Sequence, residues 1–165
     1  AYVLIAIVLF PTLYSPFPAK CQQITIVSGD QFVLALRLDD PTLVDVTHTI
    51  IVISNASHPS LEINASYQLP AAARIYGGIT VDHDPRYFAL NLSQSSESKY
   101  SISSRIVNLQ ALKVYTARLT YVLGGVIRKI GNDKWHLDFT FQSRQKGIEV
   151  VVKIPKPIYL SLIHI

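Results

Sequence analysis

Residues 61–69 read Leu61-Glu62-Ile63-Asn64-Ala65-Ser66-Tyr67-Gln68-Leu69, so that every odd position is apolar or aromatic and every even position is polar. Residues 135–142 follow the same rule. Successive side chains of a β-strand point to opposite faces of the sheet, so this alternation predicts two half-buried strands. In the second strand it places Trp135, Leu137 and Phe139 in the core, and it places His136 and Asp138 on the polar face.

Shorter segments with the same character fill most of residues 23–154. The segment 44–54 is rich in Val, Ile and Thr, which suits a pleated sheet. Ser28-Gly29-Asp30 has the composition of a turn, and Gly124-Gly125 predicts a hairpin between residues 113–123 and 126–130. No long helical pattern is present. We therefore expect an all-β fold, an antiparallel β-sandwich of about nine or ten strands, immunoglobulin-like or jelly-roll-like.

The composition is that of one globular domain. The chain has 165 residues, of which 49% are hydrophobic and 16% charged, and this excludes a disordered protein. A single cysteine, Cys21, excludes an internal disulfide. We expect residues 21–159 to form one sandwich domain that depends on its hydrophobic core.

Both ends of the chain differ in character from this domain. Residues 2–10 form an apolar run like the core of an export signal, and the chain contains no methionine. We interpret residues 1–20 as a truncated signal peptide or N-terminal anchor, so the protein is expected to be exported, either extracellular or membrane-anchored. Residues 160–165 resemble a translated sequencing adapter and are interpreted as a non-native tail.

Three Asn-x-Ser sequons begin at Asn55, Asn64 and Asn91. Asn64 and Asn91 occupy polar positions of predicted strands, and outward placement is what an N-linked glycan requires. Chance occurrence is the alternative, because such short motifs arise readily in chains rich in Asn and Ser.

Asp82-His83-Asp84 is the densest group of potential metal ligands. Carboxylates at alternate positions of a loop suit calcium, although an ordinary turn before Pro85 is the competing interpretation. No other cofactor is expected. Tyr76 and Tyr87 flank this group and predict a shallow ligand patch together with Asp82 and Asp84.

Catalytic motifs are missing from the sequence. Neither a Gly-x-Ser-x-Gly elbow nor a His-Glu-x-x-His metal motif occurs. His136 and Asp138 share one strand face and are the remaining candidates for acid–base chemistry, but a structural cross-strand role is favoured. His48 falls in phase with apolar residues and is interpreted as a core histidine. We predict that the protein is not an enzyme.

Positive charge is concentrated in residues 128–156. This concentration is interpreted either as a solvated strand face or as a surface for an anionic partner. The positive residues are Arg128, Lys129, Lys134, Arg144, Lys146, Lys153 and Lys156, and the first three with Lys153 are the candidates for the anionic surface. Nucleic acid is not expected as a partner, since no basic motif with interleaved aromatics is present.

The segments 119–125, 131–139 and 147–155 together resemble extracytoplasmic β-domains of archaeal membrane-anchored proteins, some of which carry a cytoplasmic winged-helix regulator. The resemblance implies a β-sandwich ectodomain followed by a transmembrane helix, which would lie beyond Tyr159. It implies no functional residues.

The function expected from the sequence is a non-catalytic extracytoplasmic sensing or interaction domain that meets protein or glycan at the cell surface. The alternative is a secreted carbohydrate- or calcium-dependent binding module appended to an enzyme.

Overall fold

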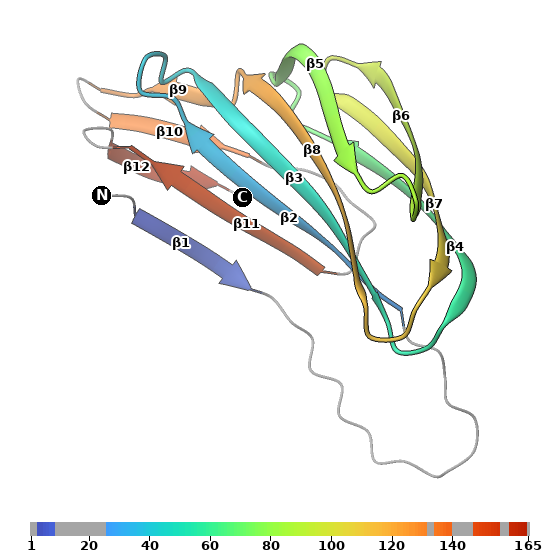
Figure 1. Ribbon diagram of the computed structural model, residues 1–165. Coiled ribbons are helices and arrows are strands. Elements are labelled where there is room, and N and C mark those ends of the chain that lie inside the picture. The colour runs from blue at the N-terminus through green and yellow to red at the C-terminus, as the bar shows by residue number, and fades with distance from the viewer. Residues whose placement is uncertain (1–2, 9–25, 132–133, 140–146, 156–158, 165) are drawn as a thin grey trace.

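The computed structural model describes residues 3–8, 26–131, 134–139, 147–155 and 159–164. These residues form twelve β-strands and no helix (Figure 1). The strands are β1 (Val3–Val8), β2 (Ile26–Leu36), β3 (Leu43–Ser54), β4 (His58–Gln68), β5 (Arg74–His83), β6 (Phe88–Ser96), β7 (Lys99–Leu109), β8 (Val114–Gly124), β9 (Ile127–Lys129), β10 (Lys134–Asp138), β11 (Gly147–Ile154) and β12 (Tyr159–His164).

The strands form three sheets. Sheet A has the order β1-β11-β2-β3-β8-β5, sheet B has β4-β7-β6, and sheet C has β12-β10-β9. Neighbouring strands run antiparallel except in the pairs β11–β2 and β10–β12, which are parallel. In the view of Figure 1, sheet C lies near β11 and β2 at the left of the long sheet A, and sheet B lies near β8 and β5 at its right.

One face of sheet A packs against both smaller sheets. Phe32 of β2 contacts Tyr67 of sheet B at a ring-centroid distance of 6.3 Å, and it contacts Phe139, just after β10 of sheet C, at 5.7 Å. All three side chains are fully buried in one continuous hydrophobic cluster. The all-β fold predicted from the sequence is confirmed, and the packing of the sheets is consistent with a β-sandwich. The described residues form twelve strands, where about nine or ten were expected.

The alternation that decided the fold holds in β4 and only in part in β10. In β4, Ile63, Ala65 and Tyr67 are buried, while the polar residues between them are exposed. In β10, Leu137 is buried as predicted, and so is Phe139 just beyond the strand.

The prediction for the first residues of β10 was wrong. His136 is 8% exposed, because Arg128 of the neighbouring β9 lies over it and donates from Nε to His136 Nδ1 at 3.1 Å. Trp135 is only half-buried, with Lys129 Nζ 5.8 Å from its ring, so it borders the core.

Two predicted turns are also wrong. β2 continues through Ser28-Gly29-Asp30, because the inward side chain of Asp30 finds polar partners in the core. Gly124-Gly125 forms no hairpin; it carries the chain from β8 in sheet A to β9 in sheet C. Gly125 has φ +79°, and a Cβ there would collide with the carbonyl oxygen of Ala72, so only glycine fits this crossing.

The terminal segments pair with the sheets. β1 lies antiparallel to β11, with Val3 opposite Ile154, and β12 lies parallel to β10. Cys21, most of the predicted strand 23–27 and the end of the predicted strand 135–142 lie outside the described residues. None of the described residues belongs to a helix long and apolar enough to span a membrane.

Candidate binding site

The turn between β5 and β6 is built around Asp84. Its carbonyl oxygen accepts from the backbone N–H groups of Tyr87 and Phe88, each at 3.0 Å. Its carboxylate accepts from the backbone N–H of Arg86 at 3.0 Å and from the Arg86 guanidinium at 2.7 and 3.0 Å. These bonds lower the pKa of Asp84 to about 2, with the side-chain bond to Arg86 as the largest cause. The turn therefore has a rigid, ionised centre.

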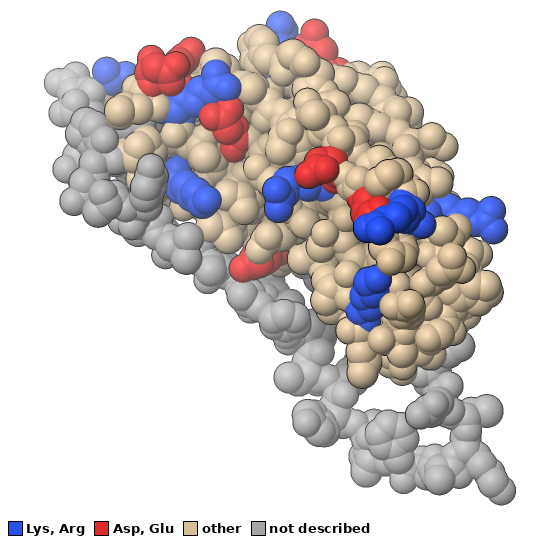
Figure 2. All heavy atoms as spheres, in the orientation of Figure 1, with Lys and Arg blue, Asp and Glu red and all other residues tan. Residues whose placement is uncertain are grey.

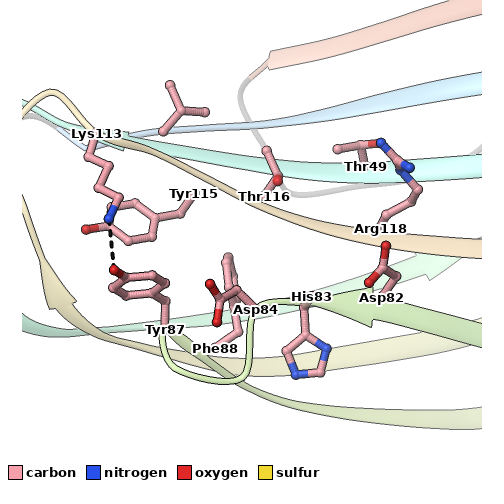
Figure 3. A pocket seen from close by; sticks show the side chains of 11 residues that line it. Thr49, Asp82, His83, Asp84, Tyr87, Phe88, Lys113, Tyr115, Thr116 and Arg118 are labelled. Carbon is pink, nitrogen blue, oxygen red and sulfur yellow. Dashed lines mark hydrogen bonds between the residues drawn. The ribbon is translucent and has the colours of Figure 1, made fainter.

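A hollow of about 350 Å³ opens beside this turn, between β5, β8 and the start of β6. We call it the β5–β8 hollow (Figure 3). Its lining is mostly polar: Thr49, Asp82, His83, Asp84, Tyr87, Phe88, Lys113, Val114, Tyr115, Thr116 and Arg118.

One end of the hollow holds a cation on aromatic rings. Lys113 Nζ donates to the Tyr87 hydroxyl at 3.0 Å and lies 4.1 Å from the Tyr87 ring centroid and 5.4 Å from that of Tyr115. The bond to Tyr87 raises the pKa of Lys113, so its ammonium stays charged. Tyr115 meets the Tyr87 ring edge-on, and Arg86 lies 5.7 Å from it. Tyr87 is therefore engaged by the protein itself.

The other end of the hollow carries opposite charges that face each other. Asp82 of β5 lies directly across from Arg118 of β8 in the strand register (Figure 3). Both side chains are exposed, and no ion pair within 4.0 Å joins them or connects either to another described residue. Their hydrogen-bonding groups are available to a ligand.

The structure brings together most of the predicted ligand patch. Asp82, Asp84 and Tyr87 line the hollow, but Tyr76 does not. Lys113 and Arg118 were not anticipated. The alternation of Arg118 with the inward Ala117 and Leu119 could have predicted its outward position. Only the pairing of β8 with β5 places it opposite Asp82.

Calcium binding at Asp82 and Asp84 gains no geometric support. Asp84 already accepts from Arg86, and among the described residues no three His, Cys, Asp or Glu side chains form a metal-binding group. A metal at this turn would have to displace the guanidinium.

A second polar cluster lies in the core between sheets A and B. His48 Nε2 is 2.8 Å from Asp30 Oδ1, and the Tyr67 hydroxyl donates to the same oxygen at 2.8 Å. The Tyr100 hydroxyl lies 3.1 Å from His48 Nδ1 and 3.2 Å from the Tyr121 hydroxyl. Phe32 stacks on His48 at 4.2 Å. We call Asp30, His48, Tyr67, Tyr100 and Tyr121 the core network.

The core network is structural. Asp30 is 2% exposed and His48 0%, so no substrate reaches them. Burial raises the pKa of Tyr67, Tyr100 and Tyr121 far above the usual tyrosine range, which keeps their hydroxyls protonated. A buried carboxylate needs such donors, because leaving it unpaired costs several kcal/mol, roughly.

The remaining candidates lie apart from the hollow. Asn55, Asn64 and Asn91 are exposed, and Asp138 is half-buried. Arg128 contacts His136 while the adjacent Lys129 contacts Trp135, so these two cations emerge on opposite faces of the β9–β10 pair. Lys134 and Lys153 are exposed, whereas Arg144, Lys146 and Lys156 lie outside the described residues. On the described part of the face in Figure 2, acidic and basic side chains are interspersed among uncharged ones.

Comparison of the chain with protein-family models, curated proteins and solved structures finds no match.

Proposed function

We propose that this protein is a non-catalytic binding domain and that the β5–β8 hollow holds a polar ligand. One observation carries the proposal. At one end of the hollow Asp82 and Arg118 lie opposite each other in the strand register but form no ion pair, and the ammonium of Lys113 lies at the other end. Concave sites with a few convergent polar groups are the usual form of ligand sites. The strands beneath the hollow, β5 and β8, are paired in the main sheet.

Binding fits this chemistry better than catalysis does. The two carboxylates of the hollow could act as a glycosidase pair only if one of them stayed protonated near neutral pH. Asp84 has a pKa of about 2 and is held by Arg86, so it cannot serve as the general acid. The described lining contains no serine or cysteine to act as a nucleophile.

The proposal includes a location outside the cytoplasm. This location is supported by the apolar N-terminal run and by the three sequons, whose asparagines are all exposed. The partner would then be a molecule met at the cell surface. The alternative of a calcium-dependent module has less support, because Arg86 occupies the carboxylate that calcium would need.

The proposal is tested by two-dimensional ¹⁵N–¹H NMR with a panel of small probes: neutral monosaccharides, uronic acids, free amino acids and inorganic phosphate. We expect at least one probe class to shift the amide signals of residues 82–88 and 113–118. Arg118→Ala should abolish those shifts, because it removes the unpaired guanidinium from the hollow.

The matched control is Arg105→Ala, which removes an equally exposed arginine from β7 in the opposite layer. It should leave binding unchanged. If no probe shifts these signals, or if both variants weaken binding equally, the hollow is not the binding site.

A further inference from the structure

The outer face of the β8–β5 pair carries a row of exposed polar and aromatic side chains. Core-facing residues of β8 are Tyr115, Ala117, Leu119 and Tyr121, so the residues between them point outward. Across the register, Thr120 lies opposite Thr80, and Arg118 lies opposite Asp82. We call Tyr76, Thr80, Asp82, Thr116, Arg118 and Thr120 the β8–β5 strip; all six are exposed.

The strip is continuous with the β5–β8 hollow. Asp82, Thr116 and Arg118 belong to both. From the level of Tyr76, which pairs with Val122, to Thr116 the strip spans six residues of β8. At about 3.3 Å per residue this is a length of roughly 20 Å. A surface of this length suits an extended ligand better than a compact one.

Tyr76 forms an aromatic platform at the far end of the strip. Its ring occupies the space above Gly124, where a Cβ would come within 2.6 Å of Tyr76 Cε2. The glycine therefore lets the ring rest on the backbone of β8, and the side chain remains 51% exposed. The bulge at Gly77 and Gly78, both with positive φ, keeps Tyr76 and Thr80 on the same face.

The chemistry of the strip matches a polyol. Threonine hydroxyls, a carboxylate and a guanidinium can each donate to or accept from sugar hydroxyls. The negative face of the tyrosine ring attracts the partly positive C–H groups of a pyranose. The strip holds one formal positive and one formal negative charge, so it does not select for an anion.

Other extended ligands fit less well. A peptide in β-conformation binds through main-chain groups at a sheet edge. The backbone groups of β8 are already paired with β3 and β5, and the edge strand β5 is interrupted by the bulge at Gly77 and Gly78. A nucleic acid needs several cations along its backbone, and the strip supplies one.

We propose that the β8–β5 strip binds an extended, uncharged glycan chain, with a terminal or branch residue in the β5–β8 hollow and a more distant residue stacked on Tyr76. This inference rests on the proposed function, since it names the ligand class of the same site.

The test compares a neutral monosaccharide with oligosaccharides of increasing length. A printed array of neutral oligosaccharides first identifies the bound sequence, and isothermal titration calorimetry then measures the affinity of the full-length protein. We expect the affinity to rise with chain length. Tyr76→Ala should weaken oligosaccharide binding about tenfold while leaving monosaccharide binding unchanged.

Two further variants make the result specific. Tyr76→Phe keeps the ring and should retain oligosaccharide affinity. Ile130→Ala removes an exposed apolar side chain just after β9 of sheet C, away from the strip and the hollow, and should have no effect. Circular dichroism of each variant confirms that the fold is intact.

The two proposals fail differently. If monosaccharides bind in the hollow but chain length and Tyr76→Ala make no difference, the glycan strip is overturned and the binding site stands. If the NMR panel detects amino acids or phosphate in the hollow and the array remains empty, the ligand class is overturned. If nothing binds in either assay, both proposals fall.

Discussion

At the scale of single residues, the core network converges on one buried acceptor. The Asp30 carboxylate accepts from the Tyr67 hydroxyl at 2.8 Å and lies 2.8 Å from His48 Nε2. The Tyr100 hydroxyl joins His48 Nδ1 to the Tyr121 hydroxyl, and the tautomer of His48 sets the direction of these two bonds. Through Tyr67 and Tyr100 the network links sheet B to sheet A.

The contact of Tyr67, but not of Tyr121, with the Asp30 carboxylate predicts unequal costs for removing the two hydroxyls. Tyr67→Phe removes a bond to a buried carboxylate and should lower the free energy of unfolding by about 1.5–3 kcal/mol. Tyr121→Phe removes a bond to a neutral hydroxyl and should lower it by about 0.5–1.5 kcal/mol. Urea unfolding followed by tyrosine fluorescence measures both. Equal losses would show that Asp30 is not the acceptor on which the network depends.

Asp84 gives a second residue-scale prediction, which concerns pH. Its folded-state pKa of about 2 lies below the ordinary value of 3.8, so its ion pair with Arg86 stabilises the turn above pH 4. That contribution is lost as the pH falls from about 4 toward 2. Arg86→Gln should raise the Asp84 pKa from about 2 toward the ordinary 3.8 without reaching it, because the backbone N–H of residue 86 still donates to the carboxylate. A ¹³C NMR titration of the carboxyl group measures the shift.

The control for this titration is Arg74→Gln. It breaks a different ion pair, the one between Arg74 and Glu97 at 3.4 Å. The midpoint of Asp84 should not move in that variant. A midpoint near 2 in Arg86→Gln would mean that the guanidinium does not set the acidity of Asp84.

At the scale of elements, two glycines with similar φ angles allow the cost of backbone strain to be measured apart from the cost of a steric collision. Gly77 has φ +72° with nothing within 4 Å of a hypothetical Cβ, whereas a Cβ at Gly125 would meet the Ala72 carbonyl. Gly77→Ala should cost about 1 kcal/mol of unfolding free energy from backbone strain alone. Gly125→Ala should cost at least twice as much, because the crossing from β8 to β9 must shift.

Chemical denaturation of the two alanine variants checks this difference. If both lose the same stability, the close approach to Ala72 does not constrain the crossing. Gly124→Ala would not serve as the comparison, because Tyr76 occupies the space above it and the substitution would disturb the proposed platform.

At the scale of the whole molecule, two of the three sequons lie on the layer opposite the proposed binding strip. Asn64 and Asn91 are both in register with Ser103, so they share one row on the outer face of sheet B. Asn55 lies at the turn between β3 and β4. Glycans at Asn64 and Asn91 would leave the outer face of sheet A open.

We expect glycans at Asn55, Asn64 and Asn91 when the chain is secreted from a eukaryotic host. Mass spectrometry before and after digestion with an N-glycosidase measures them, and each Asn→Gln substitution should remove one glycan mass. Ligand binding should be the same before and after digestion. An unchanged mass after digestion would contradict the prediction.

Sequence reasoning was most successful where the physical cause is local. The alternation in residues 61–69 reflects the two-residue period of a strand, and the structure confirms which side chains are buried. For Asp30, the local alternation predicts a buried position, but it was not used. Asp30 is in phase with Phe32, Leu34 and Leu36 of the buried face, but its charge and the preceding glycine suggested a turn.

By itself, the sequence determined that this protein is all-β and determined which face of β4 is buried, because strand periodicity is written in neighbouring residues. Only the tertiary structure decided that Arg118 faces Asp82, that Tyr76 lies over Gly124, and that Arg128 donates to His136. Those contacts depend on which strands become neighbours and in what register. That choice is made by the summed packing of three sheets, and no local pattern encodes it.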